Sequence, residues 1–217
     1  MKYCLVFPVV LCGAALNSPS AWSQTTPTKT DHWEVGIRSL QTDFSNRSDG
    51  FSTSNFNFSK NAIGLSRKSA GEVDLTHFLG GGLAVEVGYA LPTKRNVNAI
   101  GGGSGSVETT QLTAMLQYHR KSFVTGLSAY VGAGFGSITT SKQSFTLLNA
   151  TPVKITSSTG AAVQVGLDYK LSESVVLNLD YKYLYATSDL ALSSNGNKLT
   201  SLKLDPATIG FGIGVRF

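Results

Sequence analysis

The sequence predicts an all-β protein: an eight-stranded antiparallel transmembrane β-barrel with short periplasmic turns and long extracellular loops. The first observation is that segments of about ten residues alternate apolar with polar or small residues, as strands with a lipid-facing side do. The second is that the connections between these segments are short and long in turn. The third is the final segment, Ala207 to Phe217, which carries apolar residues on one face and three glycines with Thr208 and Arg216 on the other.

The first residues predict a secretory signal peptide. Lys2 precedes an apolar stretch from Leu5 to Leu16, and Ala21-Trp22-Ser23 offers small residues at the positions that a signal peptidase reads. We therefore expect three parts: a signal peptide over residues 1–23, a periplasmic lead over residues 24–32 and the barrel over residues 33–217.

Composition excludes several classes of function. Both cysteines, Cys4 and Cys12, lie in the predicted signal peptide, so the mature chain would hold no disulfide, thiolate metal site or catalytic thiol. Loss of Lys2 would leave 17 of the 18 Lys and Arg residues against 13 Asp and Glu, without a basic cluster, which argues against a nucleic-acid partner. No later stretch reaches the roughly 18 apolar residues of a membrane helix, so a membrane-spanning chain must form a closed barrel.

The first four predicted strands each place apolar side chains on one face. They cover Trp33 to Leu40, Glu72 to His77, Leu83 to Leu91 and about Thr110 to His119. In the third, for example, Val85 and Val87 face outward and Glu86 faces the lumen.

The second four predicted strands repeat this pattern, with glycine frequent on the inward face. They cover Leu127 to Gly136, Ala161 to Tyr169, Val175 to Tyr185 and Ala207 to Phe217. In the seventh, Leu179 and Tyr181 face outward and Asp180 faces the lumen. Glycine on the inward face suits a crowded polar lumen.

The connections give the direction of the barrel. The short turns lie at Leu79 to Gly82, at Arg120 and Lys121, and at Leu171 to Ser174. The long loops cover Gln41 to Ile63, Thr93 to Ser106, Ile138 to Ser158 and Thr187 to Ser201. Because short turns are periplasmic and long loops extracellular in outer-membrane barrels, we expect both termini in the periplasm.

Aromatic residues agree with this direction, since they form two girdles at the expected membrane interfaces. Trp33, Tyr118, Tyr169 and Phe217 fall at the periplasmic ends of strands, and Tyr89, Tyr183 and Tyr185 at the extracellular ends. A soluble lipocalin also has eight antiparallel strands, but it turns its apolar face inward around a ligand. Here the inward positions carry the charges and the glycines, which favours the membrane barrel.

Five stretches, taken together and in order, carry a family resemblance. They are Leu83-Ala84-Val85-Glu86-Val87 continuing to Pro92, Tyr130-Val131-Gly132-Ala133-Gly134, Gly160-Ala161-Ala162-Val163-Gln164-Val165-Gly166-Leu167-Asp168-Tyr169, Leu177-Asn178-Leu179-Asp180, and Leu204-Asp205-Pro206 running to the terminal Arg216-Phe217. In these stretches the chain resembles the OmpW family of small outer-membrane barrels. The resemblance implies a narrow barrel linked to the passage of small hydrophobic molecules across the outer membrane. Members of that family also serve as colicin receptors and are associated with stress responses.

Charged residues face the lumen at most of the predicted strands. They are Glu72 and eight residues that we assign to a polar plug: Glu34, Arg38, Asp74, Glu86, Asp168, Asp180, Lys182 and Arg216. An eight-stranded barrel is only wide enough for side chains to fill, and buried charges are tolerated when they are paired. The mixed signs predict a structural ladder of ion pairs, with an ion or proton path as the alternative.

Apolar residues near the extracellular end predict a ligand site. The candidates are Phe44, Phe51, Phe56 and Phe58 in the first loop, with Leu184 at the outer rim and Met115 deeper in the lumen. Together they would form an apolar vestibule for hydrophobic molecules, because ligand sites are usually apolar concavities with few polar groups. The alternative is that these phenylalanines only pack the loop onto its neighbours.

We expect passive passage of small hydrophobic molecules across the outer membrane of a Gram-negative bacterium, with release sideways into the lipid. The alternative is a receptor, adhesion or structural barrel that acts through its extracellular loops on a colicin, a phage or a host surface. The expected partners are outer-membrane lipid, lipopolysaccharide, small hydrophobic molecules and the barrel-assembly machinery, which would read Phe217. The barrel would be monomeric or weakly associated.

An enzyme that modifies lipid A is the rival from another class. His32, His77 and His119 all fall at the predicted periplasmic side, whereas such chemistry belongs near the outer-leaflet rim, and no nucleophile motif stands out. The histidines also lack the spacing of metal ligands. We therefore expect no catalysis, no metal and no cofactor.

Overall fold

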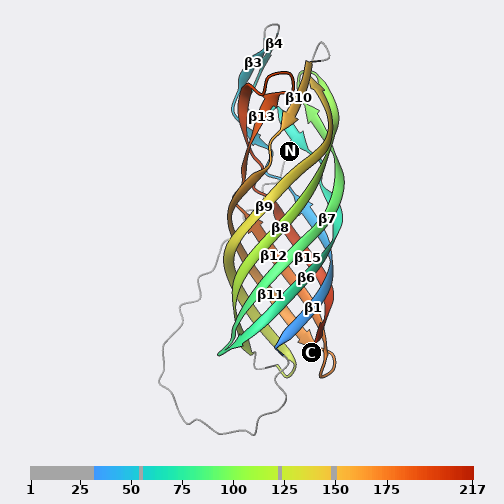
Figure 1. Cartoon of the computed structure of the whole chain (residues 1–217), viewed down its shortest axis with the longest axis vertical. Coiled ribbons are helices and arrows are strands. Elements are labelled where there is room, and N and C mark those ends of the chain that lie inside the picture. The colour runs from blue at the N-terminus through green and yellow to red at the C-terminus, as the bar shows by residue number, and fades with distance from the viewer. Residues whose placement is uncertain (1–31, 54–55, 122–123, 148–150) are drawn as a thin grey trace. The chain divides into compact units, whose positions relative to one another are not determined.

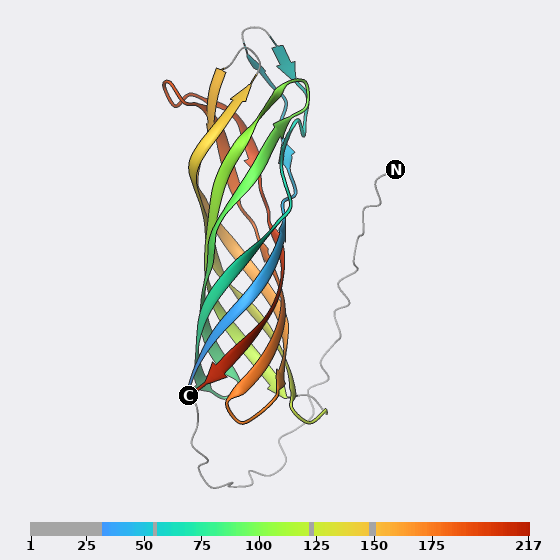
Figure 2. The same cartoon turned by 90° about the vertical axis from the view of Figure 1, so that its right-hand side faces the viewer.

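The structure, a computed structural model, describes residues 32–53, 56–121, 124–147 and 151–217. Eight antiparallel strands within these residues close into a barrel (Figure 1; Figure 2): β1 (Trp33–Asp43), β6 (Lys68–Gly80), β7 (Leu83–Ala99), β8 (Gly103–Lys121), β9 (Leu127–Leu147), β11 (Ser158–Lys170), β12 (Val175–Leu184) and β15 (Ala207–Arg216). The predicted fold class is confirmed. The predicted signal peptide, residues 1–23, and all of the predicted lead, residues 24–32, except His32 lie outside the described residues.

The first and last barrel strands pair with each other and close the ring. β1 and β15 run antiparallel from the Glu34–Arg216 pair to the Asp43–Ala207 pair. The Trp33 amide donates to the Phe217 carbonyl at 3.1 Å, and the Phe217 amide donates back at 2.9 Å. A closed ring leaves no strand edge with unpaired backbone groups, which is the condition for strands to cross lipid.

Side chains alternate between the outside and the inside of the barrel as predicted. On β1, Ile37 is 60% exposed while its neighbour Arg38 is 6% exposed. The same contrast holds on β15, where Phe211 and Ile213 are exposed and Gly210 is buried. Large apolar side chains therefore cover the outside and polar groups lie inside, which suits lipid rather than water.

The β6–β7, β8–β9 and β11–β12 connections lie at the end of the barrel where β15 finishes, and we call this the turn end (Figure 2). At β6–β7, Gly80, Gly81 and Gly82 take φ values of 89°, 63° and 85°, a conformation that glycine adopts at little cost. The opposite end, where several strands project further, is the loop end.

Two of the predicted loops are wrong, because strands continue through them. The segment Thr93 to Ser106 contains the end of β7, a turn that includes Gly101 and Gly102, and the start of β8. The segment Ile138 to Ser158 contains the rest of β9 and the further strand β10 (Thr151–Ile155).

The reason is that the alternation of polarity inverts towards the loop end. On the outer part of β7, Val97 and Ala99 point inward and are buried, whereas Asn96 and Asn98 point outward and are exposed. A polar outward face is what a strand needs where the wall meets water instead of lipid. The sequence analysis recognised a strand by its apolar outward face. It therefore predicted a loop in this segment, where the outward face is polar.

The other two predicted loops, Gln41 to Ile63 and Thr187 to Ser201, contain short strands. They are β2 (Arg47–Ser48), β3 (Phe51–Thr53), β4 (Phe56–Phe58), β5 (Ile63–Leu65), β13 (Thr187–Leu192) and β14 (Lys198–Lys203). β10, β13, β14 and β2 pair in that order beyond β9 and extend the wall at the loop end (Figure 1). Among the described residues, no helix is long and apolar enough to cross a membrane.

Candidate functional site

The barrel interior has two layers of different chemistry. The first, which we call the polar layer, lies behind the apolar outer face of the barrel. It consists of Glu34, Arg38, Glu72, Asp74, Glu86, Gln117, His119, Tyr130, Gln164, Asp168, Asn178, Asp180, Lys182 and Arg216. These residues include all eight that the sequence assigned to the plug, and every one of them points inward.

Arg38 on β1 lies at the centre of the polar layer and binds carboxylates from the two strands that follow β1 in the ring. Its Nη1 donates to Glu72 Oε1 at 2.9 Å. Its Nη2 donates to Glu86 Oε2 at 2.7 Å and lies 3.0 Å from Asp74 Oδ1. All four side chains are buried, so this one guanidinium neutralises much of the negative charge of β6 and β7.

Lys182 reaches the same carboxylates from β12, which lies opposite β7 in the ring. Its Nζ is 2.9 Å from Glu72 Oε1 and 3.1 Å from Glu86 Oε1. Asp180, two residues away on the same strand, lies 3.6 Å from Nζ. The two cations thus tie opposite walls of the barrel together through shared carboxylates.

Two glutamines complete this network, and sequence reasoning missed their role. Gln117 Nε2 donates to Glu86 Oε2 and to Gln164 Oε1, both at 3.0 Å. Gln164 Nε2 in turn donates to Asp180 Oδ2 at 2.9 Å. Both glutamines occupy inward positions of the predicted alternation, but a selection by charge overlooks neutral amides. Their amide groups add neutral donors to carboxylate oxygens that the two cations also contact.

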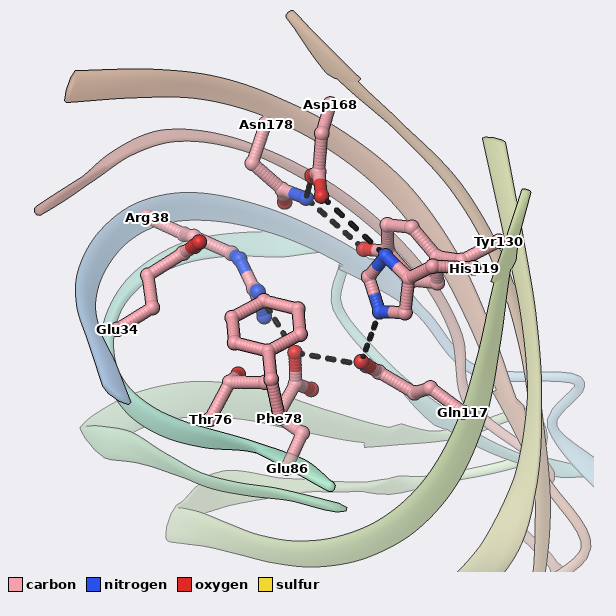
Figure 3. A pocket seen from close by; sticks show the side chains of 10 residues that line it. All are labelled: Glu34, Arg38, Thr76, Phe78, Glu86, Gln117, His119, Tyr130, Asp168 and Asn178. Atoms are coloured by element: carbon pink, nitrogen blue, oxygen red, sulfur yellow. Dashed lines mark hydrogen bonds and ion pairs between the residues drawn. The ribbon is translucent and has the colours of Figure 1, made fainter. Parts of the chain in front are cut away.

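A second cluster of the polar layer lies nearer the turn end, because Glu34 and Arg216 are register partners at the start of β1 and the end of β15. Figure 3 shows Glu34, Asp168, Asn178 and His119 of this cluster. Arg216 Nε donates to Glu34 Oε2 at 2.6 Å, and its Nη2 donates to Asp168 Oδ2 at 3.1 Å. Asp168 also accepts a bond of 2.7 Å from Asn178 Nδ2 and lies 3.5 Å from His119 Nδ1. His119, treated in the sequence only as a possible catalyst or metal ligand, also forms a hydrogen bond of 2.9 Å between its Nε2 and Gln117 Oε1, and so links this cluster to the glutamines.

Side chains fill the polar layer closely. The ten side chains in Figure 3 surround a cavity of about 10 Å³, close to the roughly 10–15 Å³ that a single water molecule needs. Inward glycines make room for this packing, because a Cβ on Gly36 would overlap the Asp74 carboxylate and one on Gly210 would overlap that of Asp180. A sugar-sized solute has no room at this level.

Towards the loop end, the interior becomes an apolar layer. It consists of Phe44, Phe51, Phe58, Ala62, Ile63, Leu65, Val97, Ala99, Val107, Met115, Ile138, Phe145, Leu147, Val153, Ile155, Ala162, Leu184, Ala186, Leu190, Leu202 and Leu204. Seven of them lie in the two segments that were wrongly predicted to be loops: Val97, Ala99, Ile138, Phe145, Leu147, Val153 and Ile155. The inversion of polarity described above is the signal that could have found them.

The apolar layer brings together five of the six predicted ligand residues: Phe44, Phe51, Phe58, Met115 and Leu184. Their side chains pack together, and the rings of Phe51 and Phe58 stack with centroids 4.7 Å apart. In this structure these five residues of the predicted vestibule belong to one packed apolar layer.

Phe56 is the exception, because its side chain is 38% exposed. Phe56 lies at the tip of the β3–β4 hairpin, where it pairs with Thr53, whereas Phe58 pairs with Phe51 further from the tip. Its ring packs edge-on against the Phe58 ring, with the two centroids 5.0 Å apart.

The wall of the barrel has two irregular places, a bulge between β7 and β8 and a groove on its outer face. The register of β7 and β8 shifts between Ala90 and Thr93, so that Leu91 and Pro92 face the single residue Thr110. Since proline has no N–H to donate, the ladder is weakened at this bulge.

The second feature is a groove of about 440 Å³ on the outer face of β8, β9 and β11. Phe135, Gly136 and Gly160 are among the residues that line it. Gly136 and Gly160 are register partners, so the wall is thin here, although the β9–β11 ladder is unbroken.

Comparison with known proteins supports the same architecture. A model of the OmpW family matches residues 42–217. Outer membrane protein AlkL of Ectopseudomonas oleovorans is 24% identical over 226 residues, which covers 98% of this chain and 96% of that protein. Outer membrane protein W of Vibrio cholerae is 29% identical over 146 residues, 62% of this chain and 67% of that protein. The crystal structure of OprG from Pseudomonas aeruginosa has a TM-score of 0.69 at 19% identity, over 86% of this chain and 97% of that one.

Proposed function

The chain belongs to the OmpW family of outer-membrane barrels, and on that premise we propose that it gives small hydrophobic molecules passive passage across the outer membrane. In an outer-membrane barrel the turn end faces the periplasm and the loop end faces the outside. A molecule that arrives from outside therefore meets the apolar layer before the polar layer.

The observation that carries this proposal is the order of the two layers. An apolar molecule gains roughly 25 cal/mol for each Å² of surface that it removes from water, so the apolar layer is a favourable place to stop. The polar layer beyond it is filled by paired charges such as Arg38 and Glu86. Displacing those groups from their partners for an apolar guest would cost several kcal/mol per ion.

Release must then occur sideways through the wall, and the β7–β8 bulge is the exit that we propose. Backbone hydrogen bonds are already missing there, so local separation of the strands breaks fewer of them than elsewhere. Leu91, on the outer face of the bulge, is 45% exposed and presents an apolar surface to lipid. The cargo would pass from the apolar layer into the bilayer without crossing the polar layer.

Replacing Phe58 with aspartate is expected to lower the transport rate of an apolar fluorescent probe by about tenfold in proteoliposomes, since roughly 1.5–3 kcal/mol of aromatic burial is lost and a charge replaces it. Phe58 is 4% exposed, whereas Phe56 on the same short strand is 38% exposed. Phe56→Asp is therefore the matched control, with a rate close to that of the wild type. Equal transport rates for the wild type, Phe58→Asp and Phe56→Asp would show that the probe does not bind in the apolar layer.

A receptor that acts through its loop end is the second candidate. It is favoured by the paired extension of β10, β13, β14 and β2, which gives the outer end an ordered surface with polar outward residues such as Lys154. Removing residues 193–197 from the β13–β14 turn separates the two functions. Loss of a binding phenotype with unchanged probe transport would favour the receptor.

A further inference from the structure

Arg95 is a buried cation inside the apolar layer. It lies on the outer part of β7, where it pairs with Val107, and its side chain points inward at 3% exposure. Its guanidinium carbon lies 4.8 Å from the centre of the Phe44 ring. A buried charge without a counter-ion lowers the stability of the folded protein, so we asked what Arg95 could bind.

Its protein partners are all neutral. Arg95 Nε donates to Thr109 Oγ1 at 2.9 Å, and Nη1 donates to the Ser66 carbonyl at 3.2 Å. Among the described residues, no carboxylate forms an ion pair with Arg95 and nothing accepts a hydrogen bond from its Nη2. Arg38 and Arg216, the inward arginines of the polar layer, each hold two or more carboxylates.

Electrostatics agree with this incomplete pairing. The negative charge of Asp43 acts on Arg95 from a distance, without an ion pair between the two side chains. An arginine side chain stays positively charged at neutral pH. An anion that approached Nη2 would supply the missing acceptor and the missing charge together, and arginine binds carboxylates well because its N–H groups form a planar fork.

We propose that Arg95 binds the anionic head group of amphipathic cargo, an alkyl carboxylate above all, while the alkyl chain lies in the apolar layer. The inference rests on the proposed function and adds a substrate class to it. The site also lies close to the proposed exit. Thr109, which accepts the bond from Nε, pairs with Thr93 at the first position beyond the β7–β8 bulge.

The test compares the uptake of decanoate and decanol, which share a chain length and differ in head group, by cells of a Gram-negative host that lacks its own barrel of this family. Arg95→Met is expected to reduce decanoate uptake by about tenfold, the value of a charge-assisted hydrogen bond, and to leave decanol uptake unchanged. Arg95→Lys keeps the charge and should retain part of the decanoate uptake. Lys94→Met, an exposed cation one residue away, is the matched control and should change neither.

A direct readout separates this inference from the proposed function. The Nε–H NMR signal of Arg95, identified by its absence in Arg95→Met, is expected to shift when decanoate is added to the protein in nanodiscs and to stay in place with decanol. A selective shift supports the site even if wild-type cells take up neither compound, a result that would contradict the proposed function alone. An equal fall of both uptakes in a heat-resistant, folded Arg95→Met barrel, or no shift with decanoate, overturns the inference.

Discussion

Replacing Arg38 with methionine is expected to destabilise the folded barrel by about 3–5 kcal/mol. The substitution preserves much of the side-chain volume but leaves buried carboxylates of Glu72, Asp74 and Glu86 without the guanidinium that holds them at 2.7–3.0 Å. Lys182 would then be the remaining cation in contact with Glu72 and Glu86. The change is measured as the shift in the urea midpoint of the barrel in phospholipid vesicles, at an unchanged denaturant slope.

Lys142→Met provides the control for the loss of one cation. The Lys142 side chain is 78% exposed and its ion pair with Glu108 lies at the surface, so we expect a change below about 1 kcal/mol. Similar midpoints for the two variants would mean that the polar layer does not stabilise the barrel.

A disulfide across the β7–β8 bulge is expected to reduce transport of the apolar probe to the level of protein-free vesicles. Ala90 and Gln111 are register partners immediately beside the bulge. Facing residues of antiparallel strands have Cβ atoms roughly 4.5–5.5 Å apart, near the range that a disulfide bridges. The double variant Ala90→Cys, Gln111→Cys would keep the strands together when oxidised, and reduction should restore transport.

The matched control places the disulfide at the groove, in the β9–β11 pair, which is two strand pairs further around the ring. Ser137 and Thr159 are register partners next to the Gly136–Gly160 pair. Ser137→Cys, Thr159→Cys is expected to leave transport unchanged in both redox states. If this pair blocks transport and the β7–β8 pair does not, the exit lies at the groove instead of the bulge.

Alternation of polarity was sufficient to predict the barrel strands and the side on which each residue lies. It placed Glu34, Arg38 and Lys182 in the lumen before any partner was known. It could not predict which charges meet, because the partners are distant in sequence: Lys182 and Glu72 are 110 residues apart. Those contacts depend on the closure and stagger of the ring.

The loop end was predicted less well, for a physical reason. Beyond the lipid, water replaces the bilayer as the outer solvent and the strands invert their pattern. Val97 and Ile138 are fully buried, yet they fall in segments predicted to be loops. Phe56 was predicted to be a ligand residue, but it is 38% exposed. Alternation predicts which face of a strand a residue lies on, but not whether the tip of a hairpin extends beyond the buried layer. The sequence analysis did not select Arg95, because a single basic residue in a predicted loop gives no alternation that would show its side chain to be buried.

The most direct test of the account is a paired flux measurement on the wild-type barrel in proteoliposomes that contain lipopolysaccharide. An apolar fluorescent probe and a small sugar are followed in the same preparation, with protein-free vesicles as the reference. The two-layer interior predicts that the barrel accelerates the probe and leaves the sugar at the reference rate. Sugar flux through the barrel would contradict it, because the charges around Arg38 and Glu86 would then line an open channel.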